Sequence, residues 1–199
     1  GPILNKGGEI RMAETLDRNQ EKVMTVELVA PPELPSVTSL AEVMLVEAIE
    51  FCAQKIGAST LATVIDLLEQ QDRTACEYCH YSVAKQVAAS LGTMDENVKA
   101  VYVLDYDATP EDWCFGTEAQ TTRLIHLLVW TRRKTAAFDS LVEALDRALV
   151  QAWSDTVGVR GPATLLDVQV LDDVDVRQRR GYGAFGAWMH QQPIQIWER

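Results

Sequence analysis

The chain has 199 residues, of which 47% are apolar and 24% are charged, and it contains only 11 glycines and 7 prolines. This composition excludes collagen-like, low-complexity and mostly disordered proteins, and the length suffices to bury a core without disulfides or metal. The 18 basic and 29 acidic side chains leave a formal net charge of −11. A negative field of this kind repels phosphate backbones and anionic lipids, which disfavours non-specific nucleic-acid binding.

The N-terminal residues and the apolar stretches predict a cytoplasmic protein that does not bind membranes. The longest apolar stretch, residues 124–130, is far shorter than the roughly 20 residues of a membrane-spanning helix. No basic start followed by an apolar stretch marks a signal peptide. Gly1-Pro2 resembles the remnant of a cleaved tag, so residues 1–35 are expected to be a tag remnant and an N-terminal arm. Four cysteines are too few for a disulfide scaffold and are expected to be thiols.

Residues 36–92 show the periodicity of three short helices, which make up an expected helical section. Residues 39–42 have the Ser-x-x-Glu pattern of a capping box, and Thr74 precedes Glu77 by the same spacing. A glycine at the end of a helical pattern favours termination there. The expected starts and ends of the three helices are Ser39 and Gly57, Ser59 or Thr60 and Gln70, and Thr74 and Gly92.

Residues 93–199 carry the pattern of an α/β domain. Runs rich in β-branched and aromatic residues predict strands at 98–104, 124–130, 164–171 and 193–197, and an amphipathic run predicts the longest helix at 135–157. A second, shorter helical stretch begins at residue 173. The predicted fold class is therefore α/β or α+β, a small mixed sheet with one long crossover helix. The crossover helix is expected on one face of the sheet and the helices of the preceding section on the other.

The run Cys76-Glu77-Tyr78-Cys79-His80 matches the haem-attachment pattern, but a buried helix face explains it more simply. With Val83 and Val87, the two cysteines form the core-facing stripe of a helix, where a free cysteine acts as a small apolar side chain. The alternative is a zinc site or a redox pair on Cys76 and Cys79. The further ligands for such a site would be His80, Cys52 and Cys114.

The run 181–186 has the glycine spacing of a dinucleotide-binding turn, but it does not directly follow a predicted strand. A candidate anion pocket would draw its charge and its backbone donors from Arg177, Arg179, Arg180, Gly181 and Gly183. The alternative is a glycine-bent chain end that packs its aromatic side chains on the core and leaves the arginines in solvent.

Acidic residues gather near the ends of the predicted strands, where α/β sheets tend to bind ligands. Asp105 and Asp107 follow the first strand, and Asp167 lies in the third. Convergent carboxylates of this kind hold Mg²⁺ in phosphoryl and nucleotidyl transferases. The alternative is a solvated acidic rim, since 29 acidic residues produce clusters by chance. His126 in the second strand is expected to be an interior or ligand-facing residue rather than a catalytic base.

Residues 80–199 contain, in order, a helix ending in Leu91-Gly92, the strand 98–104, a strand ending in Leu127-Leu128-Val129, a long helix, and Leu166-Asp167-Val168. This order resembles that of the small nucleotidyltransferase domains. Where that family has a phosphate-gripping Gly-Ser turn, this chain has Asp105-Tyr106-Asp107, and two of the family's metal-binding carboxylates match Leu124 and His126. Asp167 alone matches an acidic position. The resemblance implies the family's fold without its chemistry, and no catalytic residue is assigned.

These observations predict a non-catalytic binding or regulatory protein on a degenerate nucleotidyltransferase-like fold. It is expected to be a homo-oligomer with a small-molecule or protein partner, and no cofactor is predicted. The first alternative is a Mg²⁺-dependent phosphoryl or nucleotidyl transferase that uses Asp105, Asp107 and Asp167. The second alternative is a zinc or redox protein built on Cys76 and Cys79.

Overall fold

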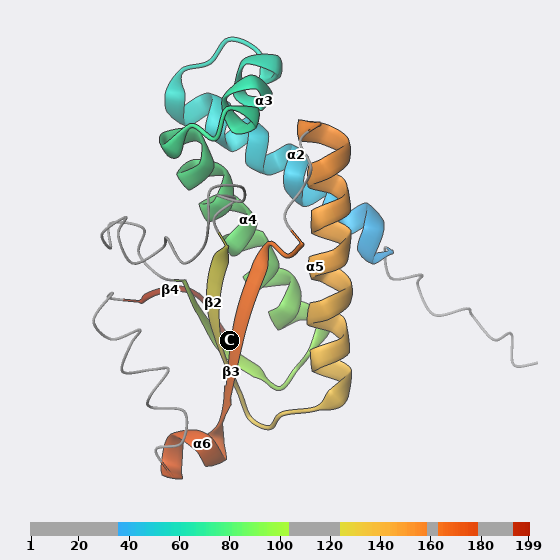
Figure 1. Ribbon diagram of the computed structural model, residues 1–199. Helices are drawn as coiled ribbons and strands as arrows, with labels where there is room; N and C mark the ends of the chain where they lie inside the picture. Colours follow the sequence, from blue (N-terminus) through green and yellow to red (C-terminus); the bar gives the residue numbers. More distant parts are fainter. Residues whose placement is uncertain (1–35, 104–123, 159–162, 179–192) are drawn as a thin grey trace, which may run out of the picture. The chain divides into compact units, whose positions relative to one another are not determined.

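The computed structural model describes residues 36–103, 124–158, 163–178 and 193–199 (Figure 1). All of these residues belong to one compact unit, 35–199. Its helices and a four-stranded mixed sheet confirm the predicted α/β or α+β class. None of the described helices is both long and apolar enough to cross a membrane.

Helices and strands follow one another much as the sequence predicts. The three N-terminal helices are α2 (Val37–Ile56), α3 (Leu61–Glu69) and α4 (Arg73–Met94). The remaining elements are β1 (Val98–Val103), β2 (Ile125–Thr131), α5 (Ala136–Val157), β3 (Leu166–Asp172), α6 (Asp173–Gln178) and β4 (Ile194–Glu198). Thr60 and Thr135 cap α3 and α5 with their side chains, and Gly57 and Gly158 end α2 and α5 in the left-handed conformation, as glycine allows.

The sheet has the strand order β3-β2-β1-β4. β1 pairs antiparallel with β2 and β4, whereas β2 pairs parallel with β3 through the α5 crossover. The second and third predicted strands therefore lie side by side, with His126 directly opposite Asp167 and Trp130 opposite Leu171. Because opposed residues point to the same side, each such pair shares one face of the sheet.

One core cluster joins the helices to a single face of the sheet. It contains Ile125, Leu127 and Val129 of β2 together with buried residues of α2, α4 and α5. The His80 ring of α4 lies 5.7 Å from the Trp153 ring of α5, a contact that a sheet between them would prevent. The expectation that the N-terminal helices cover the opposite face is therefore wrong, and α2, α4 and α5 lie on the same side (Figure 1).

Helix starts and ends differ from the predictions where a neighbouring residue caps better. Ser36 caps α2 by accepting from the Ser39 amide, so the Ser39 capping box is not used. Asp72, rather than Thr74, caps α4. An aspartate side chain accepts these amide protons as well as Ser or Thr does, so α4 begins at Arg73 and Thr74 lies inside its first turn.

Gly92 does not end α4, which continues to Met94. Its missing side chain instead makes room for β4, because a Cβ at residue 92 would lie 2.1 Å from the Trp197 ring atom Cζ2. The Arg199 guanidinium completes this junction by donating to the carbonyls of Gly92, Val98 and Asp95. The C-terminal strand is thus anchored to the end of α4.

Candidate functional site

The structure describes five of the predicted site residues, namely Asp167, Arg177, Cys76, Cys79 and His80. Asp105, Asp107, Arg179, Arg180, Gly181 and Gly183 lie outside the described residues. The nucleotidyltransferase resemblance aligns His126 and Asp167 with metal-site positions of that family. Both residues lie in strands, and the structure brings their side chains together.

His126 and Asp167 form a hydrogen-bonded pair on neighbouring strands. The imidazole Nδ1 lies 2.7 Å from Asp167 Oδ2. The side chains are 19% and 38% exposed, so the pair is partly accessible to a ligand. The hydrogen bond from His126 holds the pKa of Asp167 below its ordinary value, against the opposing effect of burial. Gln169 Nε2 donates to the other carboxylate oxygen of Asp167, so both oxygens already accept hydrogen bonds.

The position of Asp167 is set by the start of its strand. The Asp146 carboxylate of α5 accepts from the Thr164 hydroxyl at 2.6 Å and from the Leu165 and Leu166 amides at 2.8 and 2.9 Å. These bonds fix β3 in register on α5 one residue before Asp167. Asp167 therefore lies at the amino end of β3, whereas the sequence places it among carboxylates near the strand ends where ligands bind.

The face that carries this pair is the second face of the sheet, defined by Tyr102, His126, Leu128, Trp130, Asp167, Gln169 and Leu171. It combines two partly exposed aromatic rings with the buried Leu128 and with polar groups. None of these residues belongs to the core that α2, α4 and α5 share. A face of this composition provides apolar contact area and hydrogen-bonding groups for a ligand.

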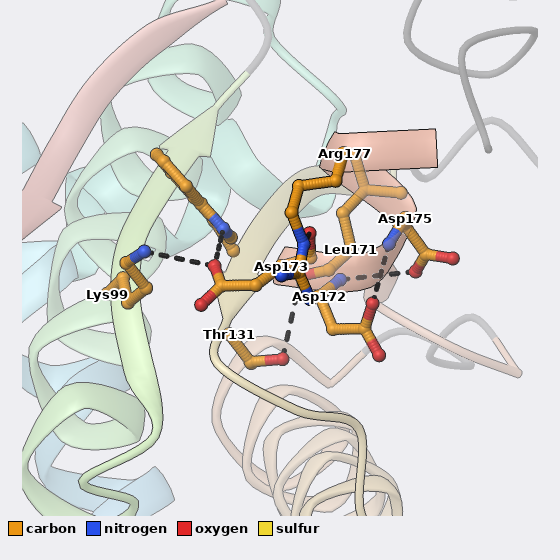
Figure 2. A network of polar contacts seen from close by, with 8 residues as sticks. Lys99, Thr131, Leu171, Asp172, Asp173, Asp175 and Arg177 are labelled. Carbon is orange, nitrogen blue, oxygen red and sulfur yellow. Dashed lines mark hydrogen bonds and ion pairs between the residues drawn. The ribbon is translucent and has the colours of Figure 1, made fainter. Parts of the chain in front are cut away.

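A second polar network lies at the other end of β2 and β3 (Figure 2). Asp173 Oδ1 accepts from Lys99 Nζ at 3.0 Å and from Trp130 Nε1 at 2.8 Å. The Lys99 ammonium also lies 4.1 Å from the centroid of the Trp130 ring, a cation–π contact. Asp172 and Asp175 cap α6 reciprocally, and Lys134 Nζ lies 2.5 Å from Asp175 Oδ2. These contacts hold pKa values of Asp173 and Asp175 below the ordinary range, chiefly through hydrogen bonds from Lys99 and Lys134.

The sequence pattern singles out neither Lys99 nor Trp130 as a site residue. A lysine inside a β-branched run was a usable signal, because a buried strand tolerates an ammonium only where it finds a partner. The partner, Asp173, lies 74 residues away. Of the candidate anion-binding arginines, Arg177 donates from Nε to the backbone carbonyl of Asp173.

Cys76 and Cys79 lie on α4 as predicted, with Cys79 fully buried and Cys76 partly so. Val83 and Val87 continue the same buried stripe. Burial strongly raises the pKa of the Cys79 thiol, and the nearby Cys52 and Cys76 add to this effect. In the described part of the chain, no three His, Cys, Asp or Glu side chains are grouped so that they could hold a metal ion. This arrangement agrees with the core interpretation of these cysteines.

Comparison of the chain with family models, with curated proteins and with solved structures finds no match. Function is therefore inferred from the arrangement of the described side chains.

Proposed function

We propose that this chain is a non-catalytic binding or regulatory protein on a degenerate nucleotidyltransferase-like fold. The observation that carries the proposal is the 2.7 Å contact between His126 and Asp167. His126 stands where the resembling family has a carboxylate, and Asp167 stands at a position that is acidic in that family. An imidazole paired with one carboxylate does not supply the oxygen ligands that two Mg²⁺ ions need beside a triphosphate.

The same pair suits a binding site on the second face of the sheet. Its partial exposure lets it exchange hydrogen bonds with a ligand, while the partly exposed rings of Tyr102 and Trp130 offer aromatic contacts. A small molecule or a short segment of a partner protein would be oriented by the polar pair and held by these rings. The proposal needs no reacting group.

We further propose that the protein is a homo-oligomer. Among the described strands, β3 and β4 are the two edges of the sheet, and β4 exposes the large apolar side chain of Ile194. An edge strand offers unpaired backbone groups to a second copy of the chain. Light scattering on the purified protein at micromolar concentrations tests this point, and a monomeric mass would contradict it.

The test for absent catalysis compares the wild type with Asp167→Asn. Each protein is incubated with the four common nucleoside triphosphates and either Mg²⁺ or Mn²⁺, and the release of phosphate and pyrophosphate is measured. We expect no release above the blank and no metal-dependent rise in the melting temperature with either protein. Turnover by the wild type that Asp167→Asn abolishes would overturn the proposal in favour of a transferase using Asp105, Asp107 and Asp167.

Asp139→Asn is the matched control for that substitution, because Asp139 lies on the exposed first turn of α5. Turnover lost in both variants would indicate a general loss of charge rather than a site. The zinc alternative is decided separately by elemental analysis, in which stoichiometric zinc dependent on Cys76 would support it.

A further inference from the structure

We propose that Asp173 and Asp175 of α6 occupy a cationic surface that binds a small polyphosphate, and that this ligand displaces α6. The surface, called here the α6 seat, consists of Lys99, Trp130 and Lys134. These three residues come from β1, from β2 and from the turn before α5. Lys99 and Trp130 donate to Asp173 at 3.0 and 2.8 Å, and Lys134 Nζ lies 2.5 Å from Asp175 Oδ2. Figure 2 shows Lys99 beside Asp173.

The donor chemistry of the α6 seat suits phosphate as well as carboxylate. Two ammonium groups and an indole N–H donate to anionic oxygens, and such charge-assisted bonds form equally with phosphate oxygens. The Trp130 ring holds the Lys99 ammonium at 4.1 Å from its centroid, so Lys99 keeps a contact when Asp173 leaves. The seat therefore remains formed without α6.

α6 is weakly held for an element that carries two ion pairs. It has six residues, none of them buried, and a helix this short is not stable on its own. The Lys99 and Asp173 side chains are 35% and 36% exposed, and an ion pair this exposed contributes little and is screened by salt. In the second pair Lys134 is 48% exposed, whereas Asp175 is only 13% exposed. A ligand with several negative charges can therefore compete with the two aspartates.

The charges around the seat favour such a ligand. Arg132 and Arg133 directly precede Lys134, are exposed, and form no ion pair with another described residue. They lie at the same end of β2 as Trp130, in a chain whose net charge is −11. Displacement of α6 would leave four cationic side chains here and remove two carboxylates. A di- or triphosphate matches this charge, whereas a monovalent anion does not.

The experiment follows the indole N–H resonance of Trp130 in ¹H–¹⁵N spectra, assigned with Trp130→Phe. Inorganic pyrophosphate is titrated against the full chain, and NaCl is titrated to the same ionic strength. We expect pyrophosphate to move the resonance saturably, because the indole N–H exchanges the Asp173 carboxylate for a phosphate oxygen, and we expect NaCl to move it much less. A response to NaCl equal to that of pyrophosphate, or no response to either, would overturn the proposal.

Two groups of variants separate a binding surface from a merely structural clamp. Lys99→Met should weaken pyrophosphate binding by about tenfold because it removes one charge-assisted donor. Asp173→Asn and Asp175→Asn should strengthen it because they remove the internal competitor. Lys85→Met, which removes a lysine over the Tyr81 ring on α4, is the control and should change nothing. Weaker binding in the aspartate variants would refute displacement.

Trp130 of this seat lies four residues after His126 along β2, and Asp173 lies six residues after Asp167, just past the end of β3. Trp130 also belongs to the second face of the sheet, but the proposed function rests on the His126–Asp167 contact, which a failed pyrophosphate titration would leave untouched. Nucleotide turnover that depends on Asp167 would equally leave the displacement of α6 untouched.

Discussion

Asp146→Ala tests how the crossover helix sets the position of the candidate site. In the wild type the Asp146 carboxylate accepts from the Thr164 hydroxyl and from the amides of Leu165 and Leu166. Leu165 and Leu166 are 2% and 8% exposed. Alanine leaves both buried amides without their acceptor, and an unsatisfied buried donor costs about 1–3 kcal/mol.

We expect Asp146→Ala to lower the free energy of unfolding by roughly 3 kcal/mol. This value is near the lower end of the summed cost for two amides, because Thr164 is only half-buried and water can partly replace the lost acceptor. For a domain of this size that corresponds to a fall in melting temperature of about 6–12 °C. Asp146→Asn keeps the oxygen that accepts both amides, so its loss should be about 1 kcal/mol. Urea unfolding at neutral pH measures both values.

Asp155→Ala is the control on the same helix, because Asp155 accepts a hydrogen bond only from the exposed Gln151 among the described residues. Its effect should stay within about 0.5 kcal/mol. Equal losses for Asp146→Ala and Asp155→Ala would refute the view that Asp146 fixes the start of β3. So would unchanged hydrogen exchange at the Leu165 and Leu166 amides.

Three further predictions concern the junction of α4 with β4, the His126–Asp167 pair and the buried Cys79 thiol. Gly92→Ala should lower the free energy of unfolding by about 1–3 kcal/mol through overpacking against Trp197. The same substitution should cost less in a Trp197→Ala background, and additive losses in urea unfolding would contradict this prediction. Because the pKa of Asp167 is lowered in the folded state, its contribution to stability is complete above about pH 4 and is lost as the pH falls through the folded-state value. In ¹³C-detected titration His126→Phe should raise that pKa, and an unchanged midpoint would count against the pair. Burial raises the pKa of the Cys79 thiol, so it should not react with Ellman's reagent at pH 8 in the native protein but should react in urea. Rapid labelling of Cys79 in the native protein would show that the core interpretation is wrong.

Local signals in the sequence were sufficient for most elements because those signals act over one or two turns of chain. The amphipathic run and the flanking Thr135 and Gly158 predict α5 to within a residue of its observed bounds. β-branched runs predict β1 and β2 in the same way. The prediction for Gly92 failed because the reason for that glycine is the Trp197 ring, which reaches it from a strand 105 residues later in the chain. No local pattern contains this contact.

The sequence alone determined the class of fold and the order of helices and strands, since these depend on periodicity and on capping groups nearby. Only the tertiary structure decided which face of the sheet the helices cover and which side chains meet on the other face. His126 reaches Asp167 over 41 residues and Lys99 reaches Asp173 over 74. Such pairs depend on strand order and register, which arise from packing of the whole chain rather than from the preferences of either residue.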